Sequence, residues 1–167
     1  ELREIENLVN IYDCGLKTEC AALDLVLFNK SLVCSGKEIV LTCVADGRQL
    51  NFMEDADIYA LFGNILDNAI EAVDRLEDRE KRIITLTVRV QGQILIVTEE
   101  NYYDGQLVLE QGLPVTTKVD KRFHGFGMQS IKMLTEKYGG DLRLQTKAGI
   151  YRLSILFPVV ENMEKRG

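Results

Sequence analysis

Two asparagines and a glutamate on one predicted helix are the first residues that suggest chemistry. Asn64, Asn68 and Glu71 stand at positions i, i+4 and i+7. At about 100° per residue they share one side of the helix, opposite its apolar stripe. Asparagine is a modest helix former, so two in mid-helix are locally unfavourable. Their amide oxygens suit a hard cation such as Mg²⁺, and a solvated helix face is the alternative explanation.

A second group of residues combines glycine with positive charge. Gly125-Phe126-Gly127 stands where a long loop is predicted to become a helix, and glycine there lets the backbone approach a ligand. The basic residues just before it, in an otherwise acidic chain, are Lys118, Lys121, Arg122 and His124. Each feature alone also fits an ordinary solvated loop. Together they predict a site for a polyanion such as a triphosphate, which Mg²⁺ would accompany.

The helix that carries the asparagines has the clearest apolar pattern in the chain. It is predicted over residues 55–78 with Asp55 as its cap, and its apolar positions keep a 3.6-residue period. These positions are Ile58, Leu61, Phe62, Ile65, Leu66, Ala69, Val73 and Leu76. Two more helices are predicted over residues 21–35 and 126–138, and Gly139-Gly140 ends the second of them.

Alternating apolar residues predict strands that form a largely antiparallel sheet. The predicted strands, of which the second and third form a hairpin, are residues 38–44, 83–90, 94–98, 141–145 and 151–157. Residues 99–124 show no periodicity, and a stretch of that length in a compact domain is usually a lid or a binding loop. Helices with such a sheet predict an α+β sandwich.

Length and composition limit the classes of protein that this chain can represent. Its 167 residues fit one domain, and 46% hydrophobic residues indicate an ordinary globular chain. A net charge of −6 argues against a nucleic-acid binder, which needs a basic surface for phosphates. The four cysteines lack metal-ligand spacing, which argues against a zinc site and fits a reducing compartment; they are Cys14, Cys20, Cys34 and Cys43.

Two motifs in order give the chain a family resemblance. The stretch from Leu61 to Ala72 (LFGNILDNAIEA) resembles the asparagine box of the GHKL ATPase superfamily, which includes DNA gyrase, histidine kinases and MutL. Residues 112–118 (GLPVTTK) and 124–131 (HGFGMQSI) are similar to the lid and second glycine box of agr-type quorum-sensing receptor kinases. The resemblance implies a Bergerat-type fold: a two-layer α/β sandwich whose mixed, mostly antiparallel sheet is covered by about three helices, with a long ATP lid.

The resemblance also implies roles for individual residues. Asn68 would coordinate magnesium, with Asn64 beside the phosphates one turn earlier and Glu71 on the same face of the ATP site. The backbone from Phe126 to Met128 would close over the phosphates because Gly125 and Gly127 permit it. The expected phosphate contacts from the lid are Lys118, Arg122 and His124, and Asn64, Asn68 and Lys118 form the expected catalytic set. Ile65, Ala69 and Ile131 would wall the adenine pocket or simply belong to the core.

Two positions differ from the pattern of most superfamily members. The ATP-hydrolysing branches have a glutamate that activates water where this chain has Asn64, which cannot accept a proton from water at neutral pH. This favours phosphoryl transfer over hydrolysis. Most relatives also read adenine with an aspartate at the end of a strand. Here Asn101 aligns best with that aspartate, while Asp104-Gly105 matches the usual Asp-Gly sequence more closely. Both residues remain candidates for reading adenine.

The expected function is that of the ATP-binding catalytic domain of a sensor histidine kinase. Its phosphoacceptor histidine would belong to an upstream dimerisation domain, because the single histidine, His124, lies in the glycine box. Residues 1–16 would end a dimerisation helix, 17–160 form the catalytic domain and 161–167 a tail. The full receptor would be a membrane-bound homodimer with this domain in the cytoplasm and a response regulator as partner, and the isolated domain a monomer or weak dimer. The alternatives are a GHKL-fold nucleotide-binding or protein-interaction module without kinase activity, and an anti-sigma-type serine kinase.

Overall fold

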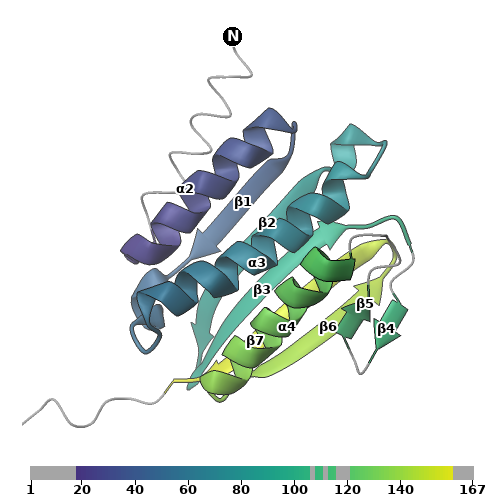
Figure 1. The fold of residues 1–167 in the computed structure, drawn as a ribbon. Helices are drawn as coiled ribbons and strands as arrows, with labels where there is room; N and C mark the ends of the chain where they lie inside the picture. The colour runs from purple at the N-terminus through teal and green to yellow at the C-terminus, as the bar shows by residue number, and fades with distance from the viewer. Residues whose placement is uncertain (1–17, 106–107, 111–112, 116–120, 160–167) are drawn as a thin grey trace, which may run out of the picture.

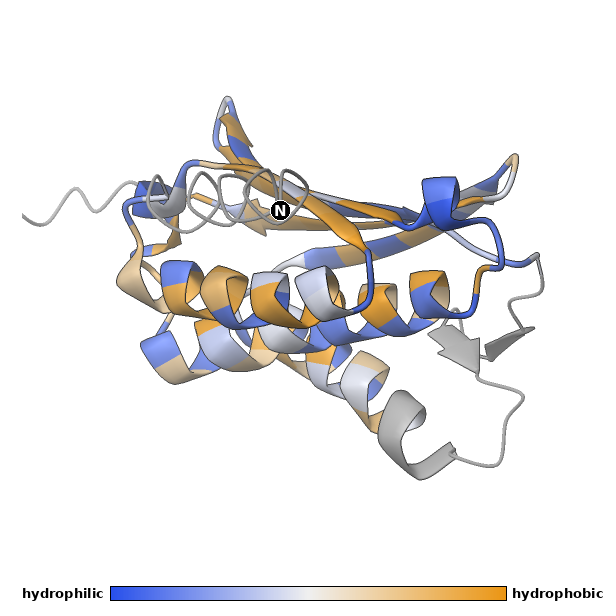
Figure 2. Ribbon diagram, turned by 90° about the horizontal axis from the view of Figure 1, so that it is seen from above, coloured by the Kyte–Doolittle hydropathy of each residue, from blue (hydrophilic) through white to orange (hydrophobic). Residues whose placement is uncertain are grey.

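The computed structural model describes residues 18–105, 108–110, 113–115 and 121–159. Within them, α2, α3 and α4 cover one face of a five-stranded sheet (Figure 1), and Figure 2 shows helices and sheet as two layers. The predicted α+β two-layer sandwich is therefore confirmed. The predicted terminal segments 1–16 and 161–167 lie outside the described residues. No helix among the described residues has the length and apolar character needed to cross a membrane.

The sheet is mixed, with one parallel pair at its edge. Its strand order is β1 (Val40–Ala45), β2 (Ile83–Gln91), β3 (Ile94–Tyr102), β7 (Ile150–Pro158) and β6 (Asp141–Lys147). Only β1 and β2 pair in parallel; the other three pairs of neighbours are antiparallel, as predicted. A parallel pair needs a crossover connection, and α3 supplies it. β4 (Val108–Glu110) and β5 (Leu113–Val115) form a separate antiparallel hairpin.

The helices are α2 (Ala21–Gly36), α3 (Asp55–Asp74) and α4 (Lys121–Lys137), with short 3₁₀ turns η1 (Gly47–Leu50) and η2 (Arg79–Lys81). α3 lies between α2 and α4 and packs on β2 and β3 (Figure 1). The largest fully buried side chains between the layers are Phe62, Phe157, Leu23, Leu27, Leu50, Ile58, Leu61, Ile65, Leu66, Ile84, Leu86 and Leu95. α4 ends at Lys137, one residue before its predicted end, and the predicted Gly139-Gly140 stop follows it. The φ of Gly139 is +68°, which suits glycine, and the Gly140 N–H donates to the Thr135 carbonyl at 2.8 Å.

The boundaries of α3 differ slightly from the prediction. The helix ends at Asp74 rather than at residue 78, although Leu76 beyond it is still 9% exposed and belongs to the core. The residue at the cap position is Glu54, and Asp55 is instead the first helical residue. An acidic side chain in the first turn is stabilised there by the helix dipole, so the same residue favours the helix for a different reason.

Three larger corrections concern the stretch predicted to be structureless. The first is that β4 and β5 form a hairpin within it. β3 continues through Tyr102, four residues beyond the predicted end at Thr98, because β2 and β7 both pair with the extension. α4 begins at Lys121 rather than at Phe126. Packing between elements thus overrides weak local propensity at the end of β3 and at the start of α4.

Candidate functional site

α3 and α4 meet where the two predicted motifs face each other. Gly127 is buried in α4, and a Cβ placed on it would lie 3.3 Å from Asn68 Oδ1 and 3.5 Å from Asn64 Oδ1. The two asparagines are half-buried and do not form the freely solvated face that was the alternative explanation. The absence of a side chain at Gly127 therefore allows α4 to approach the two amide oxygens of α3 closely.

The two asparagine amides differ in their hydrogen bonds. Asn64 Nδ2 donates to the Ala60 carbonyl one turn back at 2.7 Å, which fixes the amide and leaves its Oδ1 toward Gly127. The Asn68 side chain has no hydrogen bond to another described residue. The Oδ1 atoms of both residues can therefore accept from a ligand, and the Asn68 amide can also reorient without breaking a hydrogen bond to a described residue.

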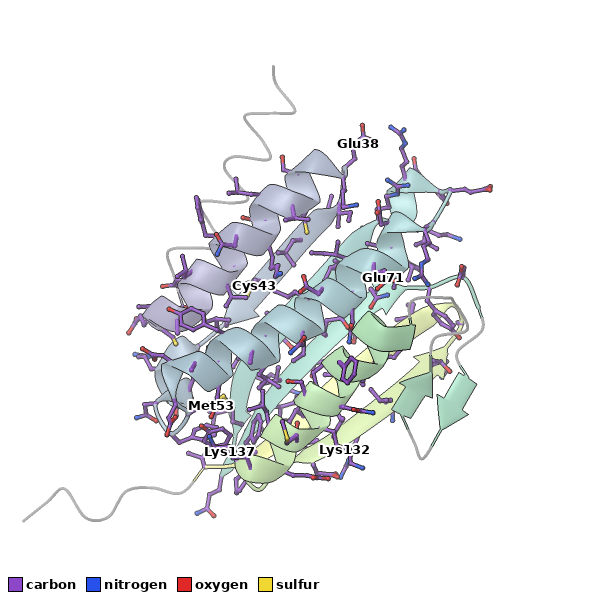
Figure 3. All side chains as sticks on the ribbon, in the orientation of Figure 1. Glu38, Cys43, Met53, Glu71, Lys132 and Lys137 are labelled. Atoms are coloured by element: carbon purple, nitrogen blue, oxygen red, sulfur yellow. The ribbon has the colours of Figure 1, made fainter. Side chains whose placement is uncertain are left out.

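Two carboxylates close to the asparagines on α3 form ion pairs. Glu71, labelled in Figure 3, pairs with Arg75 one turn further along α3. Asp67 accepts from Lys30 Nζ of α2 at 2.5 Å. The predicted place of Glu71 in the ATP site remains a prediction, and in this structure its carboxylate pairs with Arg75.

The N-terminal end of α4 corrects the predicted role of the glycine motif. Gly125-Phe126-Gly127 lies inside the helix, so these residues are not the turn that precedes it and their N–H groups are not those of its first turn. Phe126 is 65% exposed and Met128 is 5% exposed, so the two side chains point to opposite environments. Lys121, Arg122 and His124 belong to the helix, but their side chains, like Lys118 altogether, lie outside what the structure describes.

A network at the other end of the contact holds α3 and α4 together. Asp57 Oδ2 accepts from Lys137 Nζ at 2.6 Å and from the Tyr138 hydroxyl at 2.5 Å, and the Glu54 N–H donates to that hydroxyl at 3.1 Å. Hydrogen bonds from Lys137, and then from Tyr138, lower the pKa of Asp57. The network joins the first turn of α3 to the C-terminal end of α4.

The carboxyl end of β3 brings an amide to the same side of the sheet as the helices. Asn101 is 3% exposed, its Nδ2 donates to the Tyr102 carbonyl at 2.7 Å, and its Oδ1 has no hydrogen-bond partner among the described residues. Asp104, the other predicted reader of adenine, is exposed. Ile65, Ala69 and Ile131 are at most 1% exposed and belong to the hydrophobic core cluster.

Glu99 is a buried carboxyl that the sequence analysis did not single out. It is 1% exposed, and its Oε1 also lacks a hydrogen-bond partner among the described residues. Burial, and to a lesser extent the charge of Glu100, raises the pKa of Glu99 well above its ordinary value. The signal that identifies it is the strand period, since Glu99 is in phase with Leu95 and Val97 once β3 extends to Tyr102.

An open cavity of about 440 Å³ lies at this end of the sheet. It is formed where the α3–β2 connection, the residues that follow Asn101, and the β6–β7 turn meet. Tyr102, Tyr103, Asp104 and Gly105 line it from the β3 side. The lining includes Asp104 but none of Asn64, Asn68, Asn101 and Gly127, so this cavity is distinct from the contact between α3 and α4.

Comparison with known proteins identifies relatives of this chain. A family model described as a GHKL domain matches residues 53–158, which include both motifs. No curated protein sequence matches the chain. Similar solved structures include the histidine kinase AdeS of Acinetobacter baumannii, at TM-score 0.56 and 14% identity over 96% of this chain and 77% of that one. The catalytic domain of histidine kinase ThkA is similar at TM-score 0.60 and 17% identity, over 83% of this chain and 90% of that one.

A third similar structure is the blue-light activated histidine kinase EL346 of Erythrobacter litoralis, at TM-score 0.55 and 18% identity. The match covers 94% of this chain but only 48% of that kinase. At these identities the likeness is one of fold, and it extends over nearly the whole chain.

Proposed function

Because the chain belongs to the GHKL domain family, we propose that it is the ATP-binding catalytic domain of a sensor histidine kinase. In this proposal it transfers the γ-phosphoryl of ATP to a histidine on an upstream dimerisation domain. The observation that carries the proposal is the contact of Gly127 with the amides of Asn64 and Asn68, because it joins two motifs far apart in the sequence into one site. The contact holds the two neutral amide oxygens beside the glycine motif, where the resemblance implies that the phosphates bind.

The residues at this contact fit a magnesium ion that is held partly by its ligand. The described residues contain no cluster of three or more His, Cys, Asp or Glu side chains able to hold a metal. Mg²⁺ keeps several waters and needs few protein ligands when phosphates supply the rest, so the free amide of Asn68 is a sufficient protein ligand. The ion, when bound, neutralises the charge of the triphosphate.

The chemistry of Asn64 favours transfer to a protein nucleophile. An amide oxygen accepts a hydrogen bond but cannot take a proton from water at neutral pH. Phosphoryl transfer depends mainly on positioning and charge neutralisation, so it does not require a strong base at this place. In this proposal Lys118, Arg122 and His124 contribute the positive charge of the lid.

Asn101 is the proposed reader of adenine. Its amide nitrogen already donates to the Tyr102 carbonyl, so the atom left for a ligand is the acceptor Oδ1. An acceptor at this place selects a base that presents an amino group, as adenine does. The exposed Asp104 would have to hold a base in contact with water, where a hydrogen bond contributes less.

The receptor context follows from the same proposal. The partners would be the histidine-bearing dimerisation domain of the receptor and a response regulator, within a homodimeric, membrane-bound receptor of the agr type that places this domain in the cytoplasm. Neither partner is needed for nucleotide binding. ATP binding can therefore be tested on the domain before its partners are identified.

The decisive experiment is a calorimetric titration of the domain with a non-hydrolysable ATP analogue, with and without Mg²⁺. We expect magnesium-dependent binding that Asn68→Ala weakens at least about tenfold, the value of one hydrogen bond or ligand bond to a charged group. Asn29→Ala removes an exposed asparagine from α2 and is the matched control. Absence of binding at millimolar analogue in the wild-type domain would refute the proposal. Binding without any transfer to a supplied dimerisation domain would reduce it to a nucleotide-binding module.

A further inference from the structure

Glu99 occupies a position in the sheet where an apolar side chain would be expected. It lies on the inner face of β3, level with Leu86 of β2 on one side and Leu153 of β7 on the other. Both neighbours are at most 2% exposed. A leucine at this position would pack with them as core, so the carboxyl needs an explanation other than packing.

The carboxyl of Glu99 has hydrogen-bonding capacity that no described residue uses. Its Oε1 is buried and unpartnered, although buried polar atoms are nearly always hydrogen-bonded. Burial favours the neutral form of the group. A neutral carboxyl has one donor and at least one acceptor, whereas an ionised one only accepts. Such a group can bind either kind of ligand atom.

A second buried side chain with an unpartnered oxygen lies on the same face of β3. Asn101 follows Glu99 by one strand repeat, and its Oδ1 is the other buried acceptor without a partner among the described residues. Two positions along a strand are about 6.6 Å apart. The exocyclic amine of adenine and its neighbouring ring nitrogens are closer together than this, so a base that contacts Asn101 can reach the longer Glu99 side chain if that side chain leans toward Asn101 or if one water bridges the gap.

We propose that Glu99 is a second base-reading residue, which hydrogen-bonds a ring nitrogen of the purine while Asn101 accepts from the exocyclic amine. This inference rests on the proposed function, because it assigns a further contact to the same nucleotide site. The two side chains have different tasks. Asn101 offers an acceptor only, and Glu99 offers the donor that a ring nitrogen requires.

The test separates the base from the phosphates by using two ligands. One ligand is the non-hydrolysable ATP analogue with Mg²⁺, and the other is inorganic tripolyphosphate with Mg²⁺, which has no base. Glu99→Leu should weaken the ATP analogue about tenfold, the equivalent of one hydrogen bond to a buried partner, and leave tripolyphosphate affinity unchanged. Glu99→Gln keeps a donor and an acceptor and should bind the analogue within about threefold of wild type.

A control variant and the contrary results complete the test of Glu99. Glu100→Gln alters the adjacent carboxylate on the outer face of β3, where Glu100 pairs with Arg152, and should leave both affinities unchanged. A Glu99→Leu domain that binds the analogue as tightly as wild type overturns the inference and leaves the proposed function intact. A parallel loss of tripolyphosphate binding, or a loss in Glu99→Gln as large as in Glu99→Leu, also overturns it. A wild-type domain that binds neither ligand overturns the proposed function together with this inference.

Discussion

The inner face of β3 has two halves that are equally buried and chemically different. In its first half Leu95 and Val97 are 0% exposed and pack into the common core. In its second half Glu99 and Asn101 are 1% and 3% exposed, and each keeps a buried oxygen without a hydrogen-bond partner among the described residues. Burial alone therefore does not distinguish core from site. Unused hydrogen-bonding capacity does, because a core normally leaves none.

α3 shows the same division around its axis. Ile58, Leu61 and Ile65 are at most 1% exposed within the core, whereas Asn64 and Asn68 lie against Gly127 of α4. The polar half of β3 and the polar side of α3 therefore both depart from the apolar pattern of their own elements. The variants below test whether the apolar half governs stability and the polar half governs ligand binding.

The largest effect on stability is expected in the apolar half of β3. Leu95→Ala removes a fully buried side chain and should lower the free energy of unfolding by about 2–5 kcal/mol. Ile94→Ala, one residue earlier and 42% exposed, should change it by about 0.5 kcal/mol or less. Urea denaturation measures both variants. Equal effects of the two substitutions would mean that the inner face of β3 is not the core that the structure shows.

In the polar half of β3, a substitution is expected to raise the free energy of unfolding rather than lower it. Glu99→Leu removes an unpartnered buried oxygen, and should raise the free energy of unfolding of the ligand-free domain by about 1–3 kcal/mol. A lower stability of this variant than of wild type would show that Glu99 is a satisfied structural residue.

The pH dependence of this gain has a definite direction. The pKa of Glu99 is raised in the folded state, so the group favours folding below its unfolded-state pKa and loses that contribution as pH rises through the folded pKa. The advantage of Glu99→Leu over wild type should therefore be larger at pH 8 than at pH 5. Glu136→Gln, which removes an exposed carboxylate from α4, controls for a general effect of charge. An advantage that shrinks with rising pH contradicts the assignment.

The sequence predicted elements well where local pattern and tertiary packing agree. The 3.6-residue period of α3 and the alternation in the β2–β3 hairpin supported the predicted α+β sandwich, and the family resemblance supplied its two-layer arrangement. Glu99, Glu100 and Asn101 have weak strand propensity, and β7, which pairs with them, is some fifty residues further on, so the end of β3 was placed too early. Glu99 was missed for the same reason.

The start of α4 was misplaced because glycine opposes a helix locally. Gly125 and Gly127 were interpreted as a turn before the helix, but α4 includes both and places Gly127 against α3. The pairing of Gly127 with Asn64 and Asn68 was expected from the family resemblance, since no spacing in one sequence predicts a contact between two helices. The phosphate contacts expected from Lys118, Arg122 and His124 remain predictions.

The smallest expected change in stability is the difference between alanine substitutions at the two glycines of α4. Gly125→Ala meets nothing within 4 Å, so it should stabilise the domain by about 0.5–1 kcal/mol through helix propensity alone. Gly127→Ala has the same propensity gain, but its methyl group would lie 3.3 Å from Asn68 Oδ1, closer than most such contacts. It should therefore be less stable than Gly125→Ala and should weaken magnesium-dependent nucleotide binding as well. Thermal denaturation of both variants, with and without ligand, measures the difference, and equal stabilisation of the two would mean that Gly127 does not need to be small.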